Sequence, residues 1–270
     1  MCIAYPDLNP VLVSLGAIKI RWYGIMYLIS YFIARFIATR RVKAEGSGWT
    51  LKQLDQFFFY GFLGVFFGGR IGYCLFYQFP IFINDPAYVF RVWNGGMSFH
   101  GGLIGVCIAM FFLARKQKRS IWVLTDFAAP IVPIGLFFGR IGNFINDNLF
   151  GRVTNVPWAI CYPNGGYLPR QPSQLYEMFF EGFILFIILN IYIRKNRILG
   201  STSALFLLFY GVFRFILEYF RQPDPQLGFL FGIDLTMGQL LSAPMIVFGI
   251  YFLIKSYKKG EIIKIPHNFY

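Results

Sequence analysis

Seven apolar segments of about 20 residues leave this chain few possible folds. A helix needs about 20 apolar residues to cross the roughly 30 Å hydrocarbon layer of a bilayer. Of the 270 residues, 57% are hydrophobic and only 14% are charged, against about 25% in a typical soluble domain. We expect an all-α integral membrane protein with seven transmembrane helices, at residues 20–39, 57–77, 97–114, 121–139, 174–193, 201–220 and 237–254.

Basic residues cluster in every second connection between these segments. The clusters follow the first, third, fifth and seventh segments, at 40–52, 115–119, 194–197 and 255–264. Because basic loops stay on the cytoplasmic side, the N-terminus is predicted outside and the C-terminus in the cytoplasm. The net charge of +13 does not indicate nucleic-acid binding, since the basic residues form short clusters rather than one patch.

The chain is predicted to form one membrane-embedded domain, residues 1–270, because no linker or low-complexity tract divides it. Within it, residues 140–173 are rich in Pro, Gly, Asn and aromatic residues and predict an outer-face subdomain of turns and short strands. The fourth segment is the least regular, because Asp126, Pro130 and Pro133 lie inside it. Breaks of that kind are tolerated where protein neighbours surround them.

Four cysteines offer no metal-binding spacing and no close pair: Cys2, Cys74, Cys107 and Cys161. We expect them to be small hydrophobic fillers. No metal or organic cofactor is implied, and none of the common soluble-enzyme motifs is present.

Three arginines lie within or at the end of apolar segments: Arg70, Arg140 and Arg214. A charged side chain at membrane depth costs roughly 2.5–3.5 kcal/mol on insertion scales and normally faces a cavity or a partner. Counted from the cytoplasmic side, all three fall in the outer half of the bilayer, as do His100 and Tyr23. This convergence predicts an anion site, and the abundant anion in a membrane is the lipid phosphate.

Helical spacing groups further polar residues with these arginines. Tyr210, Arg214 and Glu218 share one helix face at i, i+4 and i+8. The alternative is an Arg–Glu pair that only neutralises itself. Asn143 and Asn146 follow Arg140 within two helical turns, where the alternative is a capped polar helix end.

Other candidates keep two interpretations each. His100 is either a functional imidazole or a hydrogen-bonded structural one. Arg70 either binds substrate or holds helix-end carbonyls, and Glu177 is either a capping residue or a partner for an arginine. For the whole chain, the runner-up is an anionic-solute transporter, which predicts polar inner halves and inverted repeats. The inner halves are mostly apolar, and only the sequence Gly-Arg-Ile-Gly repeats, at 69–72 and 139–142. A structural scaffold would leave the arginines unexplained.

Five ordered segments carry a resemblance over nearly the whole chain: WYGIMYL (22–28), GGMSFHGGLIG (95–105), GRIGNFIN (139–146), PSQLYE (172–177) and YGVFRFILEYFRQPD (210–224). Together they resemble the bacterial prolipoprotein diacylglyceryl transferases. The resemblance implies a seven-helix protein of the cytoplasmic (inner) membrane, with its active site toward the outer, periplasmic half. It also implies transfer of the diacylglyceryl group of phosphatidylglycerol to the lipobox cysteine of a prolipoprotein signal peptide, with release of glycerol 1-phosphate.

Carried over by position, the resemblance implies catalytic or substrate-binding roles for seven residues: Tyr23, His100, Arg140, Asn143, Gly151, Arg214 and Glu218. By their own positions and spacing, Arg70, Asn146 and Tyr210 are further candidate substrate-binding residues. His100 matches the proposed general base; alternatively, the arginines lower the pKa of the substrate thiol and no base is needed. One position departs from the family pattern. Asn148 stands where a glutamate is expected, so no essential carboxylate is available there, and Asp147 points about 100° away on a helix.

Overall fold

The computed structural model describes residues 2–16, 18–44, 47–195, 197–223, 228–230 and 234–263. The chain forms two compact units. Within the described residues, the first unit lies in the ranges 2–37 and 125–263, and the second lies between residues 38 and 124. Each unit is described by itself below.

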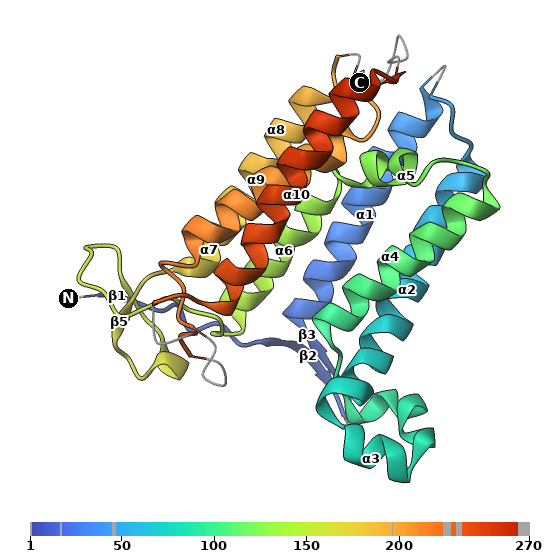
Figure 1. Cartoon of the computed structure of the whole chain (residues 1–270). Coiled ribbons are helices and arrows are strands. Elements are labelled where there is room, and N and C mark those ends of the chain that lie inside the picture. Colours follow the sequence, from blue (N-terminus) through green and yellow to red (C-terminus); the bar gives the residue numbers. More distant parts are fainter. Residues whose placement is uncertain are drawn as a thin grey trace. The chain divides into compact units, whose positions relative to one another are not determined.

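Within the residues that the structure describes, five helices are long and apolar enough to cross a membrane; Figure 1 shows how they are arranged along the chain. They are α1 (Trp22–Lys43), α2 (Leu51–Tyr77), α4 (Phe99–Lys116), α10 (Met237–Lys259) and a continuous helix made of α7 (Ser173–Glu177), the π-helix η4 (Met178–Ile184) and α8 (Leu185–Tyr192). Thr50 and Thr236 begin α2 and α10 with capping boxes, in which the threonine hydroxyl accepts the N–H of a glutamine three residues later. The protein is therefore a mostly helical, multi-pass membrane protein.

The fourth predicted span is broken. Residues 121–139 were expected to form one helix, but the structure has α5 (Ile121–Ala128) and α6 (Val132–Ile145), bent by 45°. Pro130 and Pro133 explain the break, since proline has no N–H to donate to the preceding turn. If the bent pair crosses as one span, six spans result. The sixth predicted segment is α9 (Ser201–Leu217), an apolar helix of 17 residues, shorter than the others.

In the second unit, α2 and α4 approach closely through glycines. A Cβ at Gly101 would lie 2.8 Å from Cα of Gly72, and one at Gly64 would lie 2.7 Å from Cα of Val106. A buried cluster of Met110, Leu113, Ala114 and Leu124 packs with Trp49, Phe57 and Tyr60. The helix α3 (Phe79–Asn84) and the 3-10 helices η1 (Pro86–Phe90) and η2 (Val92–Asn94) connect α2 to α4.

Within its described residues, the first unit also contains short strands that pair in three small sheets. β1 (Ile3–Ala4) pairs in parallel with β4 (Ile160–Cys161), which pairs antiparallel with β5 (Pro169–Arg170). β2 (Val11–Leu15) and β3 (Ile18–Arg21) form an antiparallel pair before α1, and β6 (Arg197–Ile198) pairs with β7 (Ile262–Ile263). The 3-10 helix η3 (Pro163–Gly165) lies between β4 and β5.

One prediction about the cysteines is wrong. Cys2 and Cys161 form a disulfide, with their Cα atoms 5.7 Å apart, and so are not apolar fillers. The parallel pairing of β1 with β4 brings the two residues together although they are 159 positions apart in the chain. Cys74 and Cys107 are free thiols; Cys74 is buried, as expected of an apolar filler, whereas Cys107 is exposed.

Candidate active site

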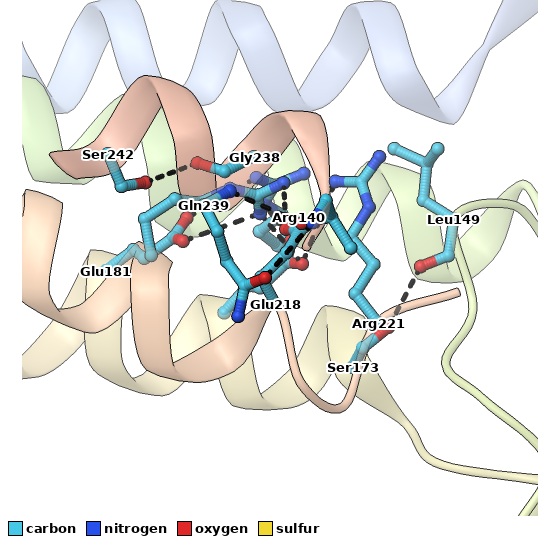
Figure 2. Close-up of polar contacts among 12 residues, drawn as sticks. Arg140, Leu149, Ser173, Glu181, Glu218, Arg221, Gly238, Gln239 and Ser242 are labelled. Carbon is cyan, nitrogen blue, oxygen red and sulfur yellow. Dashed lines mark hydrogen bonds and ion pairs between the residues drawn. The ribbon is translucent and has the colours of Figure 1, made fainter. Parts of the chain in front are cut away.

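Six charged side chains meet in the first unit. Three are arginines and three are glutamates: Arg140, Arg214, Arg221, Glu177, Glu181 and Glu218. They come from α6, from the continuous helix that includes α7 and η4, from α9 and from the residues that follow α9. Figure 2 shows Arg140, Glu181 and Glu218 converging within this group, which we call the charge cluster.

Glu177 lies at the centre of the charge cluster. Its Oε2 is 2.7 Å from Nε of Arg140, and its Oε1 is 3.0 Å from Nη1 of Arg214 and 3.8 Å from Nη1 of Arg221. Of the two interpretations of Glu177, the structure therefore bears out the arginine partner. Glu181, one turn later, is 3.3 Å from Nη2 of Arg140 and 3.6 Å from Nη1 of Arg214. Charged groups buried together in this way need partners, because desolvation is costly.

The two kinds of charge differ in burial. The side chains of Glu177 and Glu181 are fully buried, whereas those of Arg140 and Arg214 are 15% and 14% exposed. Among the residues that the structure describes, Nη1 of Arg140 has no hydrogen-bond or ion-pair partner. The buried carboxylates thus hold both guanidinium groups, and Nη1 of Arg140 remains available as a donor.

Glycines make this arrangement possible. A Cβ at Gly182 would lie 2.7 Å from Cα of Phe137, so α6 and η4 can approach only because residue 182 has no side chain. A Cβ at Gly238 would lie 2.5 Å from the carboxyl carbon of Glu218. These two glycines therefore admit α6 and the Glu218 carboxylate to the charge cluster.

The predicted face of α9 is confirmed in its geometry. Glu218 ends the helix and its Oε2 lies 2.8 Å from Nη2 of Arg214. Tyr210, one turn before Arg214, is half-buried and stacks on Phe206, with the ring centroids 5.7 Å apart. Arg214 also contacts both glutamates of the neighbouring helix, so its pair with Glu218 is not isolated.

The polar residues that follow Arg140 occupy the last turn and the end of α6. Asn143 is buried on α6, and Asn146 ends that helix. In the part of the chain that the structure describes, Oδ1 of Asn146 is buried without a hydrogen-bond partner. Tyr23 packs against Gly142, where a Cβ would lie 2.6 Å from its ring, and its hydroxyl is 2.9 Å from that of Tyr27. The structure thus brings Tyr23 to the same end of α6 as Asn143.

Gly151 acts through its backbone. Its N–H donates to the carbonyl of Gln171 at 2.9 Å, and it forms an antiparallel bridge with Arg221. A Cβ would lie 2.5 Å from the carbonyl oxygens of Gln171 and Phe220. Glycine is therefore required here, and the bridge holds the chain that carries Arg221.

His100 and Arg70 belong to the second unit. His100 is exposed in the first turn of α4 and contacts the ring of Phe99. Its expected convergence with the arginines of the first unit stays a prediction. Arg70 is 2% exposed and donates to carbonyl oxygens of Tyr88, Val89, Arg91 and Gly95, at 2.5–3.0 Å. These bonds favour the structural interpretation of Arg70, in which it holds the connection between α2 and α4.

Asp147 does not occupy the place of the acid expected at Asn148. Oδ2 of Asp147 accepts the N–H of Asn164 at 2.6 Å, which ties it to η3. Burial raises the pKa of Asp147, and the Asn164 hydrogen bond only partly opposes this. Asn148 itself is exposed, and its carbonyl accepts Nε2 of Gln174 at 2.8 Å.

Sequence reasoning did not select Glu181 or Arg221. Glu181 stands four residues after Glu177, so helical spacing alone would have placed the two on one face. Arg221 had no such signal, because it follows the end of α9 and is positioned by the bridge to Gly151.

Chemically, the charge cluster suits an oxyanion with several acceptor atoms. Guanidinium groups form forked, charge-assisted hydrogen bonds to phosphate. Because the arginines are already held by buried carboxylates, little reorganisation is needed when such a group binds.

Comparison with known proteins identifies relatives along the whole chain. Residues 10–255 match the family described as "Prolipoprotein diacylglyceryl transferase". The chain is 58% identical over 262 residues to the phosphatidylglycerol–prolipoprotein diacylglyceryl transferase of Mannheimia succiniciproducens, covering 97% of this chain and 98% of that protein. The enzymes of the same name from Pasteurella multocida and Vibrio campbellii are 58% and 57% identical, covering 96% and 95% of this chain and 98% and 93% of their own lengths.

Proposed function

The chain belongs to the prolipoprotein diacylglyceryl transferase family, and from this premise we infer that it is a transferase acting on phosphatidylglycerol and prolipoproteins. It transfers the diacylglyceryl group to the thiol of the lipobox cysteine in the prolipoprotein signal peptide. The products are a thioether-linked lipoprotein precursor and glycerol 1-phosphate. This is the first step of lipoprotein maturation.

One observation gives the strongest support for a phosphate site. Arg140 and Arg214 are fixed side by side by the same two buried glutamates, and both guanidinium groups remain partly exposed. This arrangement is preorganised for an anion. The phosphate of phosphatidylglycerol binds to Arg140 and Arg214, while Glu218 holds Arg214 and Gly151 holds the chain of Arg221. Asn143, Asn146, Tyr23 and Tyr210 orient the head group around it.

The reaction needs charge stabilisation on the leaving group. The substrate sulfur attacks the glycerol carbon of the diacylglyceryl group, a carbon–sulfur bond forms, and the carbon–oxygen bond to phosphate breaks. Negative charge then grows on the departing glycerol phosphate, where Arg140 and Arg214 stabilise it. The thiol proton goes to His100, because imidazole is the side chain that most often serves as a general base near neutral pH. If the arginines alone lower the pKa of the thiol, His100→Gln retains most activity.

The membrane arrangement is part of the proposal. Seven spans, counting the bent pair and α9, place the N-terminus outside and the C-terminus in the cytoplasm, as one domain in the bacterial inner membrane. The Cys2–Cys161 disulfide supports this topology, because disulfides persist in oxidising compartments such as the periplasm. Residues near both cysteines, including the 140–173 subdomain, then lie on the outer face, and the charge cluster opens toward it.

A transfer assay tests the proposed function. Purified wild type is given labelled phosphatidylglycerol and a lipobox peptide, and both the modified peptide and the released glycerol 1-phosphate are measured. Arg140→Ala is expected to lower transfer by about 100-fold or more while the protein stays folded. Arg140→Lys keeps the charge but loses the fork and should recover little. Arg91→Ala, which removes an exposed arginine paired with Asp85, serves as the control and should transfer normally.

The opposite outcome is equally informative. Wild type in native lipid that transfers nothing to a peptide accepted by a positive-control enzyme contradicts the proposal. Measurement of anionic-solute flux into liposomes would then test the transporter alternative.

A further inference from the structure

The charge cluster is balanced before any substrate binds. Its three arginines and three glutamates have compensating formal charges, and all six side chains are at most 15% exposed. A phosphodiester adds one negative charge to this buried site. Repulsion between that charge and the carboxylates is weakly screened at such a position. Tight binding therefore requires that one carboxylate lose its charge.

Glu181 is the most weakly held of the three carboxylates. Its two arginine contacts are 3.3 and 3.6 Å long, whereas Glu177 and Glu218 each have a contact of 2.8 Å or shorter. Glu181 is fully buried, and within the described residues its Oε1 has no hydrogen-bond partner, as is also true of Oε2 of Glu177 and Glu218, so the longer arginine contacts are what distinguish Glu181. A buried carboxylate oxygen without a hydrogen bond is costly when ionised.

The groups that face Glu181 add to this cost. Arg140 approaches from α6 and Arg214 from α9, and both attract its negative charge. Glu177, one turn earlier on the same helix, repels it, and the phenol of Tyr210 lies within electrostatic range. When a phosphate binds to the two arginines, it repels the Glu181 carboxylate and competes for the same guanidinium donors. The neutral acid does not compete in this way.

We propose that Glu181 is a positioning residue that takes up a proton from solution when the lipid phosphate binds, and thereby frees Arg140 and Arg214 to hold that phosphate. This rests on the proposed function. One proton adds to the carboxylate, no other bond forms or breaks in this step, and the cluster gains the single positive charge that a phosphodiester neutralises. Product release returns the proton to solution.

Calorimetry measures this proton directly. Wild type in phosphatidylcholine nanodiscs is titrated with water-soluble short-chain phosphatidylglycerol at pH 7, in two buffers that differ in ionisation enthalpy. The difference in heat is expected to correspond to uptake of about one proton per lipid bound. Glu181→Gln, which mimics the neutral acid, should bind the lipid with no proton uptake. Asp85→Asn, the matched control, neutralises a carboxylate outside the charge cluster and should still take up the proton.

Steady-state kinetics give a second readout. In wild type, KM for phosphatidylglycerol should rise by up to about tenfold per pH unit on the alkaline side, and in Glu181→Gln it should be nearly independent of pH. A merely structural role for Glu181 would change stability or kcat without flattening this profile. If Glu181→Gln does not fold, infrared difference spectra decide. A protonated carboxyl band should appear when wild type and Asp85→Asn bind the lipid, and its absence in wild type would overturn the proposal.

The outcomes separate this inference from the proposed function. Wild type that binds and transfers phosphatidylglycerol without proton uptake overturns the role of Glu181 alone. Wild type that binds short-chain phosphatidylglycerol no better than short-chain phosphatidylcholine, and transfers nothing, overturns the phosphate site itself. Proton uptake that persists in Glu181→Gln assigns the proton to another group and also overturns the proposal.

Discussion

Arg214 shows why the charged residues of this site act as a unit. It contacts Glu177, Glu181 and Glu218 at once, from a helix that is otherwise mostly apolar. Removing one member of a buried pair leaves the other charge uncompensated, which is more harmful than removing both. The function of each residue therefore has to be measured together with its partner.

A double-mutant cycle tests the pair of Arg214 and Glu218. We expect Arg214→Ala to lower kcat/KM by about 100-fold or more, because a donor to the leaving phosphate is lost. Glu218→Ala should lower it by about 10- to 100-fold, because Arg214 then shifts from its position. The double variant should lose little more than Arg214→Ala alone. Fully additive losses, measured in the peptide transfer assay, would contradict a functional pair.

Asp147 provides a prediction of pH dependence. Because its folded pKa is raised, the folded protein favours the protonated carboxyl. Its contribution to the unfolding free energy is fully present below the unfolded pKa of about 3.9 and declines as the pH rises through the folded value. Asp147→Asn should therefore be more stable than wild type at pH 7 and similar at pH 4. Thermal unfolding of both proteins from pH 4 to 8 checks this, and parallel curves would exclude the effect.

Some site residues can be predicted from the sequence, and others cannot. Arg140, Arg214 and Glu218 could be predicted, because a charge in an apolar segment is conspicuous and helical spacing relates neighbours on one face. Arg221 could not, since a non-local bridge to Gly151 positions it. Arg70 was as conspicuous as the others, yet its carbonyl partners lie in an irregular connection whose path the sequence does not specify.

At the scale of elements, two contacts between helices depend on a few individual residues. One is the contact of α2 with α4 through glycines, and the other is the start of α9, which is fixed by a carboxylate from α5. Apolar periodicity predicted the helices themselves. It did not predict where the fourth span bends, because proline in a membrane helix is compatible with either a kink or a complete break.

Gly101→Ala should weaken the contact between α2 and α4. The new methyl group would lie 2.8 Å from Cα of Gly72, so the helices must separate, at a cost of about 1–3 kcal/mol. Gly135→Ala is the matched control: it is a helical glycine of α6 with no atom within 4 Å of the added Cβ, and it should be neutral or stabilising. Thermal unfolding in nanodiscs measures both. Equal midpoints for the two variants would contradict the close approach.

Asp126 caps α9 from a neighbouring helix. Its Oδ1 accepts the N–H and hydroxyl of Ser203 at 2.8 and 2.6 Å, and its Oδ2 accepts the N–H of Gly200 at 2.7 Å. Asp126→Asn replaces one acceptor with a donor and removes a charge that favours the helix N-terminus, which should cost about 1–3 kcal/mol.

The matched control for Asp126→Asn is a variant of Thr202, in the first turn of α9. In the described structure the buried hydroxyl of Thr202 has no hydrogen-bond partner, so Thr202→Val should be neutral or stabilising. A thermal midpoint for Asp126→Asn as high as that of Thr202→Val would show that the cap contributes nothing.

At the scale of the whole molecule, the disulfide links two residues that are far apart in the sequence. No local sequence pattern predicts this pairing, because Cys2 and Cys161 become neighbours only when β1 pairs with β4. Alternating loop charge predicted an outside N-terminus, and an oxidised Cys2 requires a compartment in which disulfides persist. The two observations are independent, and both favour an outer location for this part of the protein.

Thiol labelling tests the disulfide and its location together. In wild type purified without reductant and denatured, a maleimide reagent should modify Cys74 and Cys107 only, and all four cysteines after reduction. Cys2→Ser with Cys161→Ser should lower stability by about 2–4 kcal/mol, whereas Cys107→Ser, at an exposed free thiol, should not. Reductant should lower the thermal midpoint of wild type to that of the double variant. If all four cysteines are labelled before reduction, the disulfide is absent and cannot support an outside N-terminus. Only the loop charges would then argue for that topology.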